Sequence, residues 1–344
     1  MMVNAITVLH ERLDSITTHI EVLKRIDAIT KQHIENEDIK YIQSKQTDEK
    51  IFNYRANIIS LYGAFEFFIE EVFKEYINNL RNIIPQYSSL NNRIRDSYFT
   101  NVTKLHSKLH YAKFSHITEQ HIAKNIERVI VQNKNEILAE SYLGNGGNYK
   151  HQIVCDLMSS VGICNVDCNI IQLSPLSDLL SESTHDKEQQ RRMVAMRLDD
   201  LVNKRNEIAH GAIIDNIIDI ESFEDILKFI SAYCDSLNTL LKHELLAQKW
   251  EQLSCTIYTP INVYGNNIAE LKVKNIQLSI GNKLLIKKQS FPSYQEAEIK
   301  EIRIKNNTIG SIEKVESINI NDDEHLISIE VSAKLKGNRE LKFI

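Results

Sequence analysis

The spacing of apolar residues changes once along this chain, and the change limits the possible folds more than any other feature. Up to about residue 250, apolar residues recur at every third or fourth position, as on the buried face of a helix. From about Ser254 onward, short β-branched runs alternate with polar residues, most clearly between Ile327 and Leu335. We therefore expect an α+β protein with two separate domains, an all-α helical bundle over residues 1–252 and a small all-β barrel or sandwich over residues 253–344.

The helical region is poor in turn-forming residues, since only 4 prolines and 10 glycines occur in the whole sequence. A first helix is expected over residues 4–31, and the polar segment 32–48 is expected to connect it to a second over residues 49–80. The second helix carries a broad apolar stripe, which predicts a central packing helix. The stripe consists of Tyr54, Ile58, Tyr62, Phe65, Ile69, Phe73, Tyr76 and Leu80.

Further helices are predicted over residues 118–139, 150–161, 186–210 and 220–250. Gly211 follows the third of these, and glycine commonly ends a helix because it accepts the left-handed conformation at little cost. Residues 144–148 are expected to form a loop. In the β region, we expect about five to seven strands without intervening helices.

Charge and composition exclude several classes of protein. The net charge of -5 argues against a protein that coats nucleic acid, so any nucleic-acid activity must be local. No stretch approaches about 18 uninterrupted apolar residues, which predicts a cytoplasmic protein that is neither secreted nor membrane-spanning. The 5 cysteines are odd in number and set among apolar residues, as expected for reduced, buried thiols without disulfides.

Three residues near the end of the predicted helix 186–210 form a candidate chemical site. Asn206 and His210 are four residues apart and share a helix face, while Arg205 projects about 100° away and borders the same pocket. Histidine can move a proton to or from an oxygen near neutral pH, and arginine can hold phosphate oxygens as negative charge accumulates. The Asn206 amide can orient the imidazole or bind the substrate. This set of groups suits phosphodiester transfer.

The segment 201–211, LVNKRNEIAHG, resembles the signature of the HEPN superfamily of α-helical ribonucleases. The upstream segment 55–69, RANIISLYGAFEFFI, resembles the early core helix of the larger prokaryotic HEPN groups, including the RiboL-PSP-HEPN type. The likeness covers roughly residues 49–250. It implies metal-independent RNA cleavage without a cofactor, in which a 2'-hydroxyl attacks the neighbouring phosphate to leave a 2',3'-cyclic phosphate.

The same resemblance assigns roles to individual residues. Arg205 and His210 would be the catalytic pair and Asn206 the polar accessory, in a composite site formed across a homodimer. Many such proteins serve in phage defence or as toxins. The expected partners are RNA, with tRNA and mRNA as candidates, and a regulatory protein as a possible further partner. Two alternatives stay open. The protein could be a non-catalytic RNA-binding or regulatory HEPN protein, a sensor or antitoxin-like partner, or the motif could be an ordinary helix end with a histidine against the helix dipole.

Other charged residues are candidates for supporting roles. Glu66 lies at the edge of the apolar stripe, where a carboxylate is costly unless paired, so it could orient Arg205 or His210. A solvated flank residue is the alternative. Lys204, Arg197 and Arg192 could guide RNA along the motif helix, or could simply form a solvated helix face.

No metal site is expected. His106 and His110 have a helical spacing found in zinc sites, but no third ligand or catalytic glutamate accompanies them. Cys155, Cys164 and Cys168 match no common zinc module.

The β region is faintly similar to the barrel used as domain two of translation GTPases, on residues 269–286 and 294–304. Asn282 stands where that barrel usually has an acidic residue, and no GTPase motif accompanies it, so the similarity implies only architecture. The region could bind tRNA, the ribosome or a partner protein, or serve as a scaffold. Lys283, Lys287 and Lys288 are its first candidate contact residues.

Overall fold

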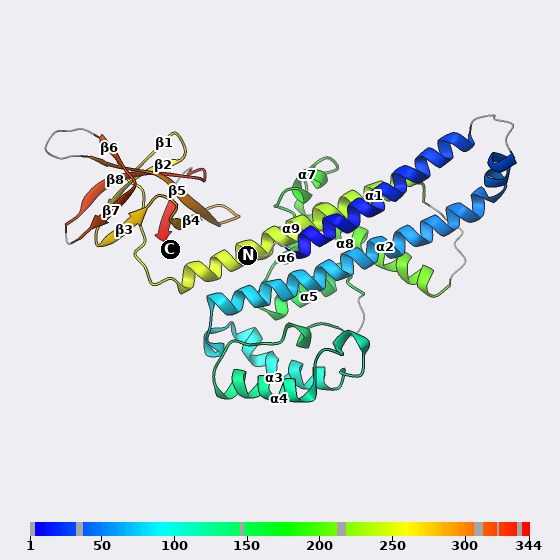
Figure 1. Cartoon of the computed structure of the whole chain (residues 1–344), viewed down its shortest axis with the longest axis horizontal. Helices are drawn as coiled ribbons and strands as arrows, with labels where there is room; N and C mark the ends of the chain where they lie inside the picture. Colours follow the sequence, from blue (N-terminus) through cyan, green and yellow to red (C-terminus); the bar gives the residue numbers. More distant parts are fainter. Residues whose placement is uncertain are drawn as a thin grey trace. The chain divides into compact units, whose positions relative to one another are not determined.

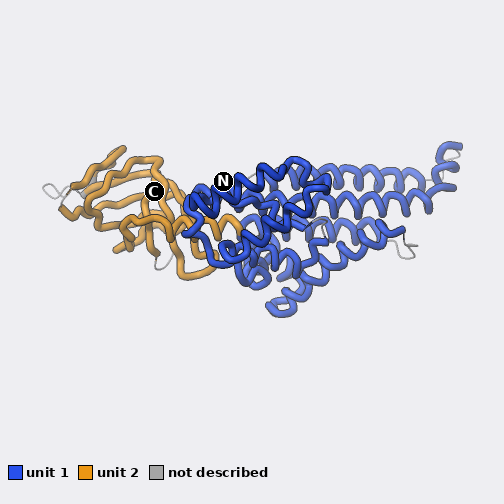
Figure 2. The backbone as a smooth tube through the Cα atoms, turned by 90° about the horizontal axis from the view of Figure 1, so that it is seen from below, with its two compact units in different colours: residues 1–240 blue, residues 241–344 orange. Residues whose placement is uncertain are grey.

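The computed structural model describes residues 4–31, 37–144, 148–211, 218–305, 312–321, 323–335 and 339–344. The chain divides into two compact units, residues 1–240 and 241–344 (Figure 2). Unit 1 is helical, and unit 2 contains the last turns of helix α9 followed by antiparallel strands (Figure 1). The predicted fold class, a helical region followed by a separate β region, is confirmed.

Long helices dominate unit 1. Helix α2 is the longest, with α1 and α8 packed against it. The helices are α1 Asn4–Thr30, α2 Glu37–Ile83, α3 Asn92–His106, α4 Glu119–Ile126, α5 His151–Ser160, α6 Val166–Ile170, α7 Leu176–Ser181, α8 Lys187–Ala209 and α9 Ile220–Gln252. Every residue of the predicted α2 stripe is buried, which confirms α2 as the central packing helix. Burying a large apolar side chain contributes about 1.5–3 kcal/mol, so this stripe is a major source of stability.

The expected connection over residues 32–48 is wrong from Glu37 onward, because α2 already begins there. This first part of α2 contacts α1 through polar groups. The Gln43 amide donates to the Thr30 carbonyl at 2.5 Å, and the Gln46 amide donates to the Asp27 carboxylate at 3.1 Å. Residues 32–36 lie outside the described residues. The apolar pattern missed this extension because polar bonds and good helix-forming residues sustain it.

The single helix expected over residues 118–139 is also wrong. Helix α4 ends at Ile126, one π-helical turn follows over Glu127–Val131, and Asn133 then adopts a left-handed φ of 56°. The Asn133 carbonyl accepts from the Tyr87 N–H at 3.0 Å, and its side chain accepts from the Ser88 N–H at 2.7 Å. These long-range bonds end the helix. Helix α3, in the polar stretch after Pro85, was not predicted.

Unit 2 is a curled antiparallel half-barrel with more strands than expected. The main sheet has the order β1-β2-β8-β5-β4-β9 with β6 beside β5, and β3 pairs with β7. The strands described are β1 Asn262–Tyr264, β2 Ile268–Val273, β3 Ile276–Ser279, β4 Lys283–Lys288, β5 Tyr294–Lys305, β6 Ile312–Val315, β7 Ser317–Ile320, β8 His325–Val331 and β9 Arg339–Phe343. Several are only three or four residues long, so their alternation was too brief to detect in the sequence.

The end of α9 is held on the strands of unit 2. The buried Lys342 ammonium donates to the carbonyls of Trp250 and Leu253, each at 2.8 Å. His243 accepts the Ser293 N–H at 2.9 Å through Nε2. Lysine thereby satisfies carbonyls that a helix end leaves without partners.

All five cysteines are free thiols. The expectation of buried thiols is confirmed only for Cys234, since Cys155, Cys168 and Cys255 are half-buried and Cys164 is exposed in the turn between α5 and α6. None of the helices in the described parts of the chain combines the length and the apolar character needed to cross a bilayer.

Candidate active site at the end of helix α8

Helix α8 ends where the sequence predicted. Asp186 caps its first turn by accepting from the N–H groups of Glu188 and Gln189, and Ala209 is its last residue. The His210 N–H donates to the Asn206 carbonyl at 3.0 Å, and Gly211 follows with a left-handed φ of 71°. The C-terminal position of glycine thus places Arg205, Asn206 and His210 in the final turn of the helix.

Arg205 is half-buried and held from two sides. Its Nη1 donates to the Asn206 side-chain oxygen at 2.9 Å, and its guanidinium carbon lies 4.8 Å from the centre of the Tyr62 ring on α2. Such a cation–π contact is worth about 0.5–2 kcal/mol, depending on exposure. The guanidinium is therefore positioned by a neighbour on its own helix and by a ring from another helix.

His210 is exposed, one helical turn after Asn206. Within the described parts of the chain, its imidazole takes part in no hydrogen bond, ion pair or ring contact. Asn206 binds Arg205, so the structure links these two residues directly and leaves His210 beside them at the surface. An imidazole in this position is available to a substrate oxygen.

Tyr62 connects Arg205 to a buried polar chain. Burial has the largest effect on the pKa of Tyr62 and raises it. The backbone bond from Tyr149 lowers this pKa and the charge of Glu66 raises it, and the net result is a pKa of about 12. The Tyr62 oxygen accepts the Tyr149 N–H at 3.2 Å, and the Tyr149 hydroxyl donates to Glu70 Oε1 at 2.9 Å. Tyr62 thus stays neutral near pH 7, with a ring that can attract the guanidinium.

Glu66 lies one turn beyond Tyr62 on α2 and is half-buried. Its negative charge contributes to raising the pKa values of Tyr62 and Tyr149. This places the carboxylate near the ring that holds Arg205. The sequence indicated Glu66 by its position in the stripe, but it gave Tyr62 no role beyond packing and gave Tyr149 no role at all. An aromatic residue in a stripe does not reveal which side chain its ring face meets.

The three candidate guiding residues are each engaged on the helix surface. Lys204 Nζ lies 2.6 Å from the Asp200 carboxylate, and Arg192 Nε lies 3.3 Å from Glu188. The exposed Arg197 guanidinium is 5.2 Å from the ring centre of Phe229. Exposed ion pairs of this kind contribute about 0–1 kcal/mol and exchange partners readily. Arg197 and Lys204 are seven residues apart and share one side of α8, whereas Arg192 projects in another direction.

No group of three or more histidine, cysteine, aspartate or glutamate residues is placed to hold a metal ion in the segments that the structure describes. The Nε2 atom of His106 lies 3.3 Å from the Glu119 Oε1 atom, so this imidazole faces a single carboxylate. Cys155 Sγ lies 3.6 Å from His151 Nε2, and burial raises the pKa of the Cys155 thiol to about 12. That thiol is protonated near neutral pH and is a poor nucleophile.

The model of the RiboL-PSP-HEPN family matches residues 20–243. This region begins within α1, ends within α9 and contains both Tyr62 and the segment from Arg205 to His210. No curated protein sequence matches the chain.

Proposed function

The chain belongs to the RiboL-PSP-HEPN family, whose functions are those of nucleases and other RNA-related proteins, and we propose that it is a metal-independent endoribonuclease. One observation carries the proposal. Arg205 is held by Asn206 and Tyr62 beside an exposed His210 at the end of α8. A fixed cation beside an available imidazole is the combination that phosphodiester transfer requires.

In the proposed reaction, the 2'-oxygen of a ribose forms a bond to the neighbouring phosphorus, and the bond from phosphorus to the 5'-oxygen breaks. His210 moves a proton in this exchange, from the 2'-hydroxyl or to the leaving 5'-oxygen. Arg205 stabilises the negative charge on the non-bridging oxygens. Asn206 keeps the guanidinium in place. The products are a 2',3'-cyclic phosphate and a 5'-hydroxyl.

Two proton transfers are needed, and we propose that a second copy of the chain supplies the other imidazole. Apolar side chains on the outer face of α2 support a homodimer. Phe52 is 70% exposed and Ile59, seven residues later, is 41% exposed on the same side of the helix. Exposed apolar groups of this size favour a protein interface. Gly63 continues the same face, and nothing lies within 4 Å of the position that a Cβ would take there.

We place this activity in the cytoplasm, in phage defence or in a toxin–antitoxin pair, with tRNA or mRNA as the substrate. The half-barrel of unit 2 would then select the target or bind a regulatory protein.

The test is incubation of the purified full chain with total RNA in excess EDTA. We expect cleavage that leaves 2',3'-cyclic phosphate ends, and loss of cleavage in His210→Ala and Arg205→Ala. His185→Ala is the matched control, because His185 is exposed just before the other end of α8. Intact RNA with the wild type would reject the enzyme and favour the alternative of a non-catalytic RNA-binding protein.

A further inference from the structure

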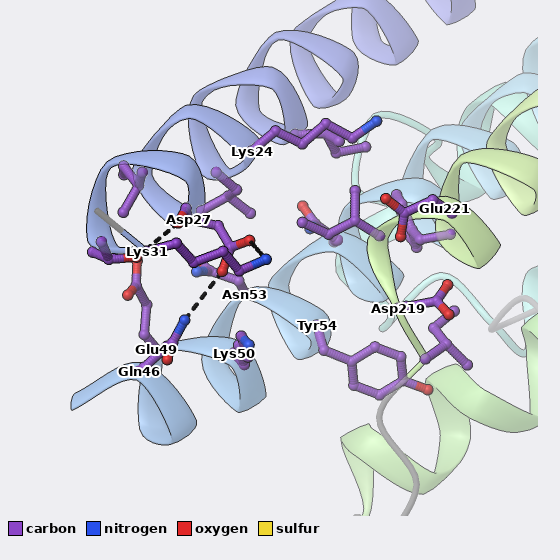
Figure 3. Close-up of a pocket in the computed structure, with 18 of the residues that line it drawn as sticks. Lys24, Asp27, Lys31, Gln46, Glu49, Lys50, Asn53, Tyr54, Asp219 and Glu221 are labelled. Atoms are coloured by element: carbon purple, nitrogen blue, oxygen red, sulfur yellow. Dashed lines mark hydrogen bonds and ion pairs between the residues drawn. The ribbon is translucent and has the colours of Figure 1, made fainter. Parts of the chain in front are cut away.

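A pocket of about 500 Å³ lies between α1, α2 and the beginning of α9 (Figure 3). Its volume is in the range of small-molecule sites. Apolar side chains form much of its wall, including Ile20 and Leu23 from α1 and Ile220 and Phe223 from α9. All residues that line it belong to unit 1.

Three polar side chains of α2 line the pocket without a partner. Tyr54 and Asn57 are each only 9% exposed, and Asn53 is half-buried. Within the described segments, none of the three side chains makes a hydrogen bond. Their polar atoms are not enclosed by protein, so they are open to a bound molecule in the pocket. The arrangement is consistent with a ligand that supplies the missing bonds.

Lysines and carboxylates line the pocket in nearly equal numbers, with Lys24, Lys31 and Lys50 against Asp27, Glu49, Asp219 and Glu221. Lys24 binds both carboxylate oxygens of Glu224, at 2.7 and 2.8 Å, and Lys31 lies 2.6 Å from Asp27. Figure 3 shows Asp27 between Lys31 and Gln46 at one side of the pocket. Because these opposite charges nearly balance, the part of a ligand that enters the pocket should be neutral, with both donor and acceptor atoms.

The pocket adjoins the candidate active site. Tyr54 and Tyr62 are eight residues apart on the buried side of α2, which corresponds to about 12 Å along the helix. Burial is the main cause that raises the pKa of Tyr54, and the negative charges of Asp200 and Glu207 on α8 add to the rise. These two carboxylates therefore lie near the Tyr54 hydroxyl. Glu207 lies within the segment from Arg205 to His210. An RNA strand bound at Arg205 could therefore reach the pocket with a neighbouring nucleotide.

We infer that this pocket binds a nucleobase of the RNA, from a nucleotide near the cleaved bond. The amides of Asn53 and Asn57 pair with donor and acceptor atoms on the edge of the base, as asparagine does with bases in other complexes. Phe223 and the aliphatic side chains contact its faces, while the charged phosphates stay outside. The inference rests on the proposed ribonuclease function and adds base selectivity to it.

The test measures binding without cleavage. Fluorescence anisotropy is recorded for the full-length His210→Ala chain with four 2'-O-methyl homopolymers, one for each base, which lack the attacking hydroxyl. We expect at least a fivefold preference for one base. Adding Asn57→Leu or Asn53→Leu should reduce that preference below twofold. Asn78→Leu, the same exchange at an exposed site on α2, should keep it.

Folding is checked by thermal unfolding. The Asn57→Leu chain should melt close to its parent, because the exchange breaks no hydrogen bond within the described residues. If Asn57→Leu does not fold, the base preference of Asn53→Leu alone tests the inference. Equal binding of the four polymers, or a preference that survives these exchanges, would overturn the inference. Neither outcome depends on whether the wild type cleaves RNA, so failure of the ribonuclease proposal is recognised separately.

Discussion

The guanidinium carbon of Arg205 lies 4.8 Å from the centre of the Tyr62 ring. This contact joins the motif helix α8 to the central helix α2, since Tyr62 is 1% exposed and fixed within the core. In the proposed reaction, a rigid ring that holds this long, flexible cation lowers the entropy that Arg205 must lose when it binds a phosphate. Tyr62 is therefore a positioning residue for Arg205.

Exchanging Tyr62 should separate the effect of the ring from that of its hydroxyl. Tyr62→Leu removes the ring, and we expect single-turnover RNA cleavage to slow by about 5- to 10-fold, equivalent to roughly 1–1.4 kcal/mol. Tyr62→Phe keeps the ring and should stay within about twofold of the wild type. If Tyr62→Leu and Tyr62→Phe fold equally well and lose the same cleavage rate, the ring has no role in positioning Arg205.

Arg205→Lys should damage catalysis far more than RNA binding. Lysine keeps the charge but lacks the planar fork that binds Asn206 and that, in the proposed reaction, binds two phosphate oxygens. We expect the cleavage rate to fall by about 100-fold, as for loss of a transition-state donor. Affinity for an uncleavable 2'-O-methyl RNA should change by no more than about threefold. A rate close to that of the wild type would show that charge alone suffices.

Alkaline pH should destabilise unit 1. Burial, the largest cause, raises the pKa values of Tyr62 and Tyr142 to about 12, above an ordinary value of 10.0. The folded state holds these protons more tightly than the unfolded state. Their stabilising contribution, roughly 2–3 kcal/mol each, is therefore complete below pH 10 and lost as the pH rises from 10 toward 12.

Urea unfolding between pH 8 and pH 11.5 measures this loss. Tyr62→Phe and Tyr142→Phe remove one ionisable group each, so the free energy of unfolding should fall less steeply with pH in both. If the free energy of unfolding falls with pH at the same slope in the wild type and both variants, other groups control the alkaline transition.

Tyr98→Phe should be strongly destabilising although it removes a single oxygen. The buried Tyr98 hydroxyl donates to the Asn125 side chain and accepts the Leu138 N–H at 3.1 Å. Its loss leaves two groups without partners in the interior, which should cost about 2–3 kcal/mol in urea unfolding. Tyr87→Phe is the control, because the Tyr87 hydroxyl makes one partly buried bond, to the Arg95 carbonyl. A smaller loss for Tyr98→Phe than for Tyr87→Phe would contradict this account.

Lys342→Met should loosen the end of α9 in unit 2. Methionine retains most of the apolar contact but leaves the carbonyls of Trp250 and Leu253 without a donor. We expect a loss of about 1–3 kcal/mol and faster amide exchange near residues 250–253. Lys272→Met, at a lysine whose side chain is 61% exposed, should change stability by about 0.5 kcal/mol or less. Unchanged exchange in Lys342→Met would argue against lysine capping.

Local sequence patterns accounted for the elements whose causes are local. The apolar stripe predicted the buried face of α2, because helical periodicity places those side chains on one side of any helix. Gly211 predicted the end of α8, because a left-handed residue there ends the helix. The predictions failed where distant bonds decided the backbone, as at Asn133, and where polar contacts with α1 extended α2 back to Glu37.

The sequence by itself determined which residue types share the last turn of α8, and hence the chemistry available there. Only the tertiary structure decided that Arg205 meets the ring of Tyr62, that Tyr149 binds the same tyrosine, and that Asn57 lines a pocket. The spacing of residues along a helix follows from its fixed geometry. Contacts between helices depend instead on how side chains from distant parts of the chain pack together, and no local pattern encodes which pairs meet.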